Sequence, residues 1–287
     1  MGSRYTWGMS EADTPALVVR ALTADRHIRF SALDASPLWD GVRRGHPHLE
    51  AEACAVLVEV LSSALLLQAR NFFSERLQIH LRSAGRARAV VADSWPDGDI
   101  RGVLDEGAGA GPWLQGPGLL QVTRSTGSDA PYVGTLELVE GPLQAQLEAY
   151  LLQSEQVQAS VHLWCDPGTG ESGGLLVELM PECPPERLRA LVEALEGLDV
   201  VPFWERTPEF LSSWINQGPG AEVLNTTAMR YRCRCSRESL LEALAGFGRA
   251  KRHEMFKDGG PVQVRCDYCG KDYTIAPGDL GPEGEEP

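Results

Sequence analysis

Apolar and polar residues alternate in short runs over much of the first 180 residues. Residues 17–36 alternate on both sides of a polar stretch at 24–27, which predicts two strands joined by a turn. Residues 76–104 alternate in the same way, with turn residues at 83–85 and 96–99, and therefore predict a meander of strands. Further strands are expected at residues 118–124, 132–138, 159–165 and 174–180.

Residues 49–73 carry a different pattern, because apolar residues occupy nearly every face of a helix there. A helix without a polar face is enclosed by other layers of a fold, so we expect this one to thread the core. Its most apolar part, residues 53–67, contains Glu59 and is shorter than the roughly 20 residues that a membrane span requires. A helix with one polar face is predicted over residues 142–156.

Two shorter helices are predicted between residues 181 and 230. The first begins with a proline and carries one apolar stripe, at the spacing i, i+3, i+4 and i+7 from Leu188. The second begins at Thr207 and Pro208, an N-cap residue followed by a proline in the first turn, and spans about two turns. Isolated helices shorter than ~12 residues are marginal in water, so this helix must dock against a neighbour.

These patterns predict an α+β fold with four parts. Residues 1–180 form an N-terminal mixed α/β core domain around the long buried helix, and residues 181–230 form a helical connector. Residues 231–275 form a small C-terminal domain, and the acidic tail at residues 276–287 is expected to be disordered.

Charge and cysteine usage narrow the function. The formal net charge of −14 and the pI near 4.9 argue against binding to nucleic acid or to an anionic membrane surface, because both attract basic proteins. The first residues contain neither the basic region nor the apolar core of a signal peptide. Only four of the seven cysteines lie at ligand-like spacings, which fits a reducing cytosol better than a secreted disulfide framework. We therefore expect a cytoplasmic protein.

Four cysteines form two close pairs near the end of the chain. One residue separates Cys233 from Cys235, two separate Cys266 from Cys269, and thirty lie between the pairs. Four thiolates at such spacings suit tetrahedral zinc with no open position, so we expect one zinc ion per chain at these cysteines. Cations near the pairs lower thiol pKa values and favour the thiolate form; they are Arg232, Arg234, Arg237, Arg265 and Lys271.

A zinc site built from two close pairs is physically suited to act as an oxidation switch. Zinc would join distant residues and stabilise a small domain that has little core of its own. If an oxidant linked Cys233 to Cys235 and Cys266 to Cys269, each disulfide would close a tiny loop and constrain almost none of the unfolded chain. The domain would then melt, and the connector helices would lose their support. The residues alone leave the pairing open, since four cysteines permit three connectivities, and purely structural zinc sites are the commoner case.

The segments around these cysteines, CRCSRES at 233–239 and CDYCGKDY at 266–273, resemble the zinc-binding signature of the heat shock protein 33 family. That family comprises redox-regulated cytoplasmic holdases. Segments similar to its other landmarks occur in the same order between about residues 15 and 275: VVRALTAD, DIRGVL, GPGLLQVT, YVGTLEL, YLLQSEQ and SGGLLVELMP.

The resemblance implies an ATP-independent molecular chaperone and not an enzyme. It implies that the four cysteines bind zinc in a reduced, inactive form and form disulfides in the oxidised form, Cys233 with Cys235 and Cys266 with Cys269. Oxidation, in cooperation with heat or mild unfolding, would release zinc and disorder the connector. The active form would be a homodimer that binds unfolded or oxidatively damaged client proteins. The sequence does not identify the surface that binds client proteins, because residues of a core and of a binding surface are equally apolar.

Two other functions remain open at this stage. One is a thiol-disulfide exchange enzyme that uses Cys266 and Cys269, and the other is a zinc ribbon that binds nucleic acid through the nearby arginines and lysine. No phosphate-binding motif G-x-x-x-x-G-K-S/T occurs in the sequence, so use of ATP is not expected. His253 could replace a thiolate ligand, but four cysteines already fill the site. The remaining cysteines are expected in a core helix, at a strand end and in a Pro-rich turn: Cys54, Cys165 and Cys183.

Overall fold

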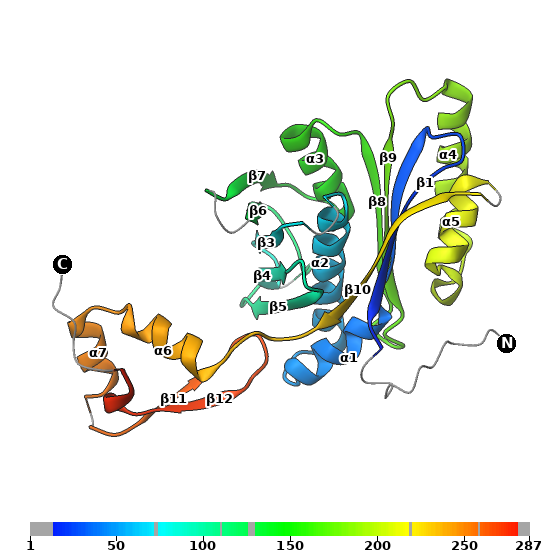
Figure 1. Cartoon of the computed structure of the whole chain (residues 1–287). Coiled ribbons are helices and arrows are strands. Elements are labelled where there is room, and N and C mark those ends of the chain that lie inside the picture. Colours follow the sequence, from blue (N-terminus) through cyan, green and yellow to red (C-terminus); the bar gives the residue numbers. More distant parts are fainter. Residues whose placement is uncertain are drawn as a thin grey trace. The chain divides into compact units, whose positions relative to one another are not determined.

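The structure of the chain, a computed structural model, describes residues 14–71, 74–109, 111–125, 130–217, 220–257 and 259–280. The chain divides into two compact units (Figure 1). Unit 1 is Met1–Arg232 and unit 2 is Cys233–Pro287.

Unit 1 is built on a ten-stranded sheet with the order β7-β6-β3-β4-β5-β10-β1-β2-β9-β8. Neighbouring strands pair antiparallel, except that β10 and β5 are parallel and pair at two positions only. The alternating segments of the sequence are strands, as predicted. The strands of this sheet are β1 Ala16–Leu22, β2 Ile28–Asp34, β3 Arg76–Arg82, β4 Ala87–Ser94, β5 Asp99–Glu106, β6 Gly118–Ser125, β7 Tyr132–Leu138, β8 Ala159–Cys165, β9 Ser172–Leu179 and β10 Glu222–Tyr231.

The long apolar helix α2 (Ala51–Ala69) threads the core, as predicted, although it is shorter than residues 49–73. Its faces contact both halves of the sheet, β3, β4 and β5 on one side and β2, β8 and β9 on the other (Figure 1). Gly102 on β5 lets the helix approach, because a Cβ there would lie 2.9 Å from Leu57 Cδ1. By length and composition α2 would pass for a membrane span, but 78% of its most apolar window is buried inside the protein, which identifies a core helix.

Two further helices pack on unit 1 at the ends of strands. Helix α1 (Ser36–Gly45), which the sequence analysis did not predict, contacts α2 and β10. Helix α3 (Leu143–Glu155) lies at the predicted place and packs against β7 and β8. Its last residue, Glu155, pairs with Arg70 and Arg124, so an ion-pair network fixes the end of α3.

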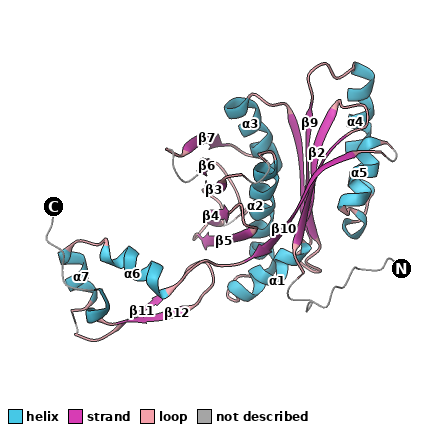
Figure 2. Cartoon of the chain, in the orientation of Figure 1, coloured by secondary structure: helices cyan, strands magenta, loops and turns pink. Residues whose placement is uncertain are grey.

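The connector helices α4 (Pro185–Gly197) and α5 (Pro208–Asn216) cover the face of β1, β2, β8 and β9 that points away from α2 (Figure 2). Short 3-10 turns join them, η2 Leu198–Val200 and η3 Phe203–Glu205. The backbone N–H of Phe210 donates to Thr207 Oγ1 at 3.2 Å, which confirms the predicted N-cap of α5. The helix is nine residues long and buries Leu211 and Ile215 against the sheet, as the docking argument requires.

Strand β10 corrects the sequence analysis, which assigned residues up to 230 to a helical connector. Residues 222–231 instead form a strand that pairs along β1 and, at its last two residues, with β5. Within the described residues, strand pairing joins the two halves of the sheet through β10 alone, although α2 also packs on both. Its sequence has no regular alternation, and what makes it a strand is the hydrogen-bonding edges on both of its sides, which a one-dimensional pattern does not reveal.

Unit 2 contains two short helices and a hairpin. Its elements are α6 Arg237–Ala245, α7 Arg249–Met255, β11 Val262–Arg265, β12 Asp272–Ile275 and the 3-10 turn η4 Pro277–Leu280. The turn η4 corrects the expectation of a disordered tail from residue 276, because Leu280 packs on the core of unit 2. The rest of that tail, residues 281–287, lies outside the described residues. The α+β fold class is thus confirmed, with a mixed core around a buried helix and a small C-terminal unit that carries the cysteine pairs.

Candidate metal centre

The two cysteine pairs come from two different arms of unit 2. Cys233 and Cys235 lie in the extended segment between β10 and α6, while Cys266 and Cys269 lie in the turn between β11 and β12. Backbone N–H groups of Cys269 and Gly270 donate to the carbonyl of Cys266 and close this turn. Gly270 has φ +69°, a conformation that favours glycine, so the turn that aims both thiols inward depends on it.

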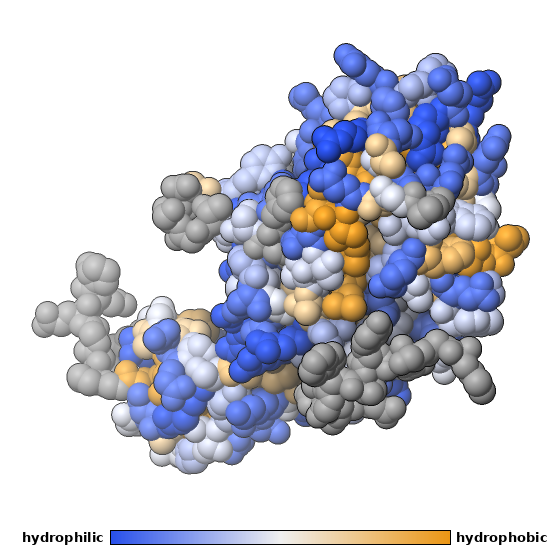
Figure 3. Space-filling view, turned by 45° about the vertical axis from the view of Figure 1, so that its right-hand side comes forward, coloured by the Kyte–Doolittle hydropathy of each residue, from blue (hydrophilic) through white to orange (hydrophobic). Residues whose placement is uncertain are grey.

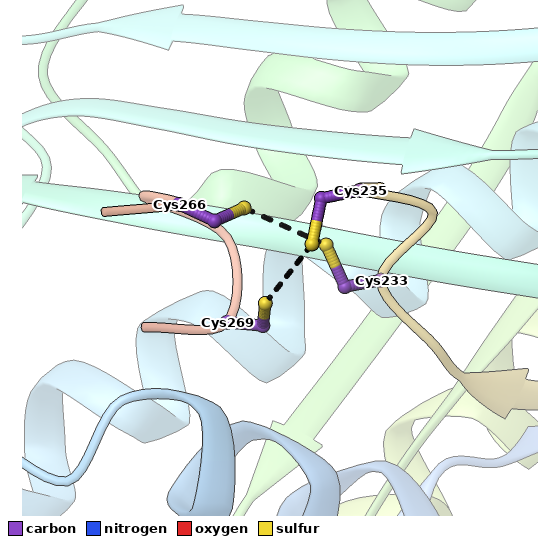
Figure 4. A group of neighbouring side chains, drawn as sticks. All are labelled: Cys233, Cys235, Cys266 and Cys269. Atoms are coloured by element: carbon purple, nitrogen blue, oxygen red, sulfur yellow. Dashed lines mark hydrogen bonds between the residues drawn. The ribbon is translucent and has the colours of Figure 1, made fainter. Parts of the chain in front are cut away.

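The four sulfur atoms converge on one point (Figure 4). All lie within 4.8 Å of one another, with Cys233 Sγ 3.7 Å from Cys266 Sγ and Cys235 Sγ 3.5 Å from Cys269 Sγ. A tetrahedron of sulfurs about 2.3 Å from a zinc ion has edges of about 3.8 Å, so the spacing fits one metal ion. These distances are far longer than the ~2.05 Å of a disulfide bond, and none of these four cysteines forms a disulfide.

Tyr273 on β12 supports the site, and the sequence analysis did not single it out. Its hydroxyl donates to Cys235 Sγ at 3.1 Å and to the Cys235 carbonyl at 3.3 Å. The contact with sulfur raises the pKa of Tyr273, because it holds the phenol in its protonated, donating form. A tyrosine two residues after the lysine of CGKDY was the available signal, but pairing it with Cys235 requires the hairpin.

The environments of the thiols differ. Burial raises the pKa values of Cys266 and Cys269 and opposes their ionisation. Burial also acts on Cys235, but hydrogen bonds from Tyr273 and from the neighbouring thiols outweigh it and lower the pKa of Cys235. Hydrogen bonds in this cluster lower the pKa of one thiol, but burial raises the pKa values of two others. Without a positive charge nearby, the cluster is therefore poorly suited to hold four thiolates. A cation at its centre would supply the missing stabilisation.

The apolar core beneath the site is small. Among the residues described in unit 2, four apolar side chains are buried, those of Leu244, Cys266, Tyr273 and Ile275. Cys266 is therefore a candidate ligand, and Tyr273 donates a hydrogen bond to another candidate ligand, Cys235. The site and the core of unit 2 are the same place, so the fold of unit 2 and the occupancy of the site are coupled.

The cations near the cysteines are exposed, as expected of a solvated face. Arg237 pairs with Asp279 at 2.5 Å, and Lys271 lies over the Tyr273 ring at 5.0 Å from its centroid. Helix α6 begins directly after Cys235 with a capping box in which Ser236 and Ser239 bond each other's backbone N–H. The positive end of this helix lies next to Cys235 in the chain and favours the thiolate there.

The remaining candidates lie outside the cluster. His253 is exposed on α7 and is not part of any potential metal group found in the described ranges. Cys54 is buried in α2, where burial raises its pKa. Burial likewise raises the pKa of Cys165 to about 12, at the end of β8. Cys183 lies before α4, with its sulfur 3.8 Å from the Pro184 carbonyl. The first two thiols are too weakly acidic to react readily.

The connector is held on the sheet of unit 1 by an apolar interface. Twelve buried residues form it, seven from the sheet and its strand ends and five from the connector, with Leu211 and Ile215 fully enclosed. Phe210 stacks on Trp214 at 5.3 Å, and Trp214 Nε1 donates to the Ala194 carbonyl at 2.7 Å, which joins α5 to α4. Other apolar side chains of the connector stay at the surface, with Val200 86% and Trp204 65% exposed. Figure 3 shows hydrophobic residues, coloured orange, at several places on the surface of the molecule.

Polar contacts with the turn between β1 and β2 also hold the connector. The turn between β1 and β2 contributes Asp25, which accepts from Arg187 Nε at 2.7 Å, and the Ala24 N–H, which donates to Asn216 Oδ1 at 2.9 Å. Arg187 also donates to the Ile215 carbonyl at 2.8 Å. The turn between β1 and β2 thus bonds to the beginning of α4 and to the end of α5. We define the clasp as Ala24, Asp25, Arg187 and Asn216.

Comparison with known proteins agrees with this arrangement. The family model described as "Hsp33 protein" matches residues 17–276. The chain belongs to the Hsp33 family. The match begins at β1 and ends just after β12, so it includes both units and all four cysteines of the cluster.

Relatives in the Hsp33 family cover nearly the same length. A 33 kDa chaperonin of Thermus thermophilus is 31% identical, over 92% of this chain and 85% of that protein. The 33 kDa chaperonin of Acaryochloris marina is 29% identical, over 92% of this chain and 95% of that protein. The crystal structure of the 33 kDa chaperonin from Thermotoga maritima has the same fold, with a TM-score of 0.78, 23% identity and coverage of 92% and 96%. Hsp33 membership makes this chain a chaperone-family protein.

Proposed function

We propose that this chain is a cytoplasmic, ATP-independent holdase that oxidation activates. The observation that carries the proposal is the convergence of two cysteine pairs, thirty residues apart in sequence, on one point within 4.8 Å. In the reduced form Cys233, Cys235, Cys266 and Cys269 bind one zinc ion and the protein is inactive.

The donor set fits zinc, because four sulfur ligands at tetrahedral spacing and no open position are typical of structural zinc sites. When bound, zinc supplies a tie between the two arms of unit 2. The residues of the chain supply the rest: Tyr273 orients Cys235, and the turn at Gly270 aims the thiols of Cys266 and Cys269.

Oxidation of the four thiolates removes the metal link between the two cysteine pairs, and its electrons and protons can be counted. Two molecules of hydrogen peroxide take four electrons from the four thiolates and, with four protons, become four water molecules. Two sulfur–sulfur bonds form, Cys233 with Cys235 and Cys266 with Cys269, and the sulfur–metal bonds break. Each new bond closes a loop of a few residues, so neither replaces the link between the arms.

Loss of the tie unfolds unit 2 and then releases the connector. Cys233 follows β10 after one residue, so disorder in unit 2 begins where the sheet strand ends. We propose residues 231–275 as the switch, residues 181–221 as the part that is released, and residues 1–180 as the part that dimerises and, with the connector, binds clients. Released helices would expose apolar side chains such as Phe210 and Trp214, which unfolding clients can bind.

A disulfide-exchange enzyme is disfavoured by the same geometry. An attacking thiol must be accessible and partly ionised, whereas Cys266 is buried and burial raises the pKa values of both Cys266 and Cys269. A turnover assay separates the two functions, because a holdase acts in stoichiometric amounts and an exchange enzyme acts repeatedly.

The test combines zinc release with chaperone activity. Reduced, zinc-loaded protein treated with peroxide at mild heat should release about one zinc per chain, measured with a chromogenic chelator, and should then suppress aggregation of a thermally denaturing client. A reduced sample kept at the same temperature is the first control. Cys183→Ser, which lies outside the cluster, should respond as the native protein does, while Cys269→Ser should not bind zinc stably. Retention of zinc after oxidation, or release without any suppression of aggregation, would refute the switch.

A further inference from the structure

A second, chemically different site lies in unit 1, between α1 and the end of β10. It is a cavity of about 330 Å³ with a mostly polar lining. Three arginines line it, Arg44 from the last turn of α1 and Arg230 and Arg232 from the end of β10. Its apolar wall is formed by Leu38, Met229 and the Tyr231 side chain.

The arginines of this cavity differ from most others in unit 1. Ten arginines of unit 1 pair with a carboxylate within 4 Å. Arg230 is one of them, because its Nε donates to Asp99 at 2.8 Å. Arg44 and Arg232 are exposed and form no ion pair with any residue that the structure describes, although the chain carries 40 acidic against 26 basic residues.

The charge inside the cavity is therefore positive. No acidic residue of the described chain lines it, and the carboxylate of Asp99, which lies next to Arg230, is engaged by that arginine. Asp40 lies one helical turn before Arg44 on α1 but forms no ion pair with it. Arg44 and Arg232 thus bring two positive charges that no described carboxylate neutralises to one cavity, and an anion bound there would be attracted by both.

We propose that this cavity binds a small molecule carrying a diphosphate group. Guanidinium groups match phosphate oxygens with paired, charge-assisted hydrogen bonds, and two of them from different elements suit two linked phosphates. The cavity has room for more than one tetrahedral oxyanion, and the apolar wall leaves space for a carbon-containing part. Inorganic pyrophosphate and a nucleoside diphosphate share this chemistry.

Binding would fix the end of β10. Arg230 and Arg232 donate their backbone N–H groups to Gly98 and Ile100, and these bonds are the parallel contact with β5. Tyr231 packs on Gly41 of α1, where a Cβ would lie 2.5 Å from Tyr231 Cβ, so α1 and the strand end touch directly. An anion held by Arg44 and Arg232 would bridge the same two elements and slow the opening of these amides.

The experiment uses the full, reduced, zinc-loaded chain and pyrophosphate as the probe. Isothermal titration at constant ionic strength should detect one site per chain. The variant R44Q/R232Q should bind pyrophosphate at least about tenfold more weakly, since two charge-assisted contacts are lost. Arg82→Gln is the matched control, because Arg82 is exposed on β3 and also forms no ion pair within the described chain.

Hydrogen exchange gives an independent measurement. Pyrophosphate should slow exchange at the Arg230 and Arg232 amides, and sodium chloride at the same ionic strength should not. ADP in place of pyrophosphate distinguishes an inorganic from an organic ligand, since tighter binding of ADP would show that the apolar wall contributes. Arg44→Gln alone, at an exposed helix end, keeps the test valid if the double variant folds poorly. Native affinity in the charge-removing variants, or equal slowing by sodium chloride, would overturn the proposal.

Discussion

The connector interface in unit 1 and the core of unit 2 bury very different amounts of apolar surface. Twelve buried residues join α4 and α5 to the sheet, and the larger cluster around α2 lies on the other face of the same strands. In unit 2 four apolar side chains are buried among the described residues, and two of these belong to the cysteine site itself. Apolar burial supplies most of the stability of the connector interface, which by our proposal opens only after unit 2 unfolds, whereas unit 2 needs the metal link between its two cysteine pairs. The comparison shows how one chain can contain a stable scaffold and a part that a chemical signal can unfold.

The largest expected effect comes from removing the metal or one ligand. Chelation, or Cys266→Ser, should unfold unit 2, because structural zinc contributes an apparent ~10–16 kcal/mol in small domains, more than four buried residues can replace. Amide exchange at Tyr273 and Ile275 should become fast while that at Leu57 and Ile79 stays slow. Cys183→Ser is the control and should leave both regions protected. Protection of Tyr273 after complete chelation would show that unit 2 does not depend on metal.

A smaller effect is expected from the connector interface. Leu211→Ala removes a fully buried side chain from a helix of nine residues. It should lower the free energy of unfolding of the connector by about 2–5 kcal/mol. The connector should then open at lower temperature, visible in the fluorescence of Trp214 and in exchange at Ile215, while unit 2 keeps its zinc. Leu188→Ala is the matched control, since Leu188 is 40% exposed and should cost much less. Equal effects of the two substitutions would mean that the interface does not hold the connector.

The pH effect of one carboxyl in α2 should be confined to unit 1. Burial raises the pKa of Glu59 in α2 to about 7. At pH below its ordinary value this carboxyl is protonated in both folded and unfolded chains. As pH rises, the unfolded chain ionises first, so the contribution of Glu59 to the stability of unit 1 should fall between about pH 4.5 and pH 7 and then level off.

The variant Glu59→Gln isolates this contribution. It should be more stable than the native protein at pH 8 by about 1–3 kcal/mol and indistinguishable from it near pH 4. Urea unfolding of unit 1 at several pH values measures the difference, and zinc affinity serves as the unchanged control. An identical pH profile for the two proteins would show that folding does not raise the pKa of Glu59.

The smallest expected effect concerns the clasp. A double-mutant cycle of Arg187→Gln and Asp25→Asn should give a coupling energy of about 0.5–1 kcal/mol, since the pair is partly exposed. The arginine substitution alone should cost more than the aspartate substitution, because it also removes the bond to the Ile215 carbonyl. Connector opening, followed by Trp214 fluorescence, is the measurement. Arg189→Gln is the control, and additive effects at Arg187 and Asp25 would rule out the clasp.

Much of the fold could be predicted from local pattern. Alternation located the strands around Leu77 and Ile79, and the apolar surface of residues 49–73 predicted the enclosed helix that the structure has at residues 51–69. The N-cap at Thr207 was correct because capping depends on neighbours in the chain. The spacing of the cysteines also predicted that all four share one site, since two close pairs at this spacing are typical of metal ligands.

The features that escaped prediction are all contacts between distant segments. Strand β10 depends on the edges of β1 and β5, and the bond from Tyr273 to Cys235 depends on the hairpin. The clasp joins residues about 160 to 190 apart. The arginine-lined cavity needs α1 beside the end of β10, and nothing in the sequence near Arg44 or Arg232 indicates that they meet.

The position of β10 has a consequence for how the protein is made. Strand β10 lies between β1 and β5 in the sheet but comes after nine other strands in the chain. While the ribosome is still synthesising residues before 222, the growing polypeptide has the halves of its sheet without the piece that joins them. Both open edges can pair with other chains during that interval. The nascent protein would itself need protection from aggregation until translation is nearly complete.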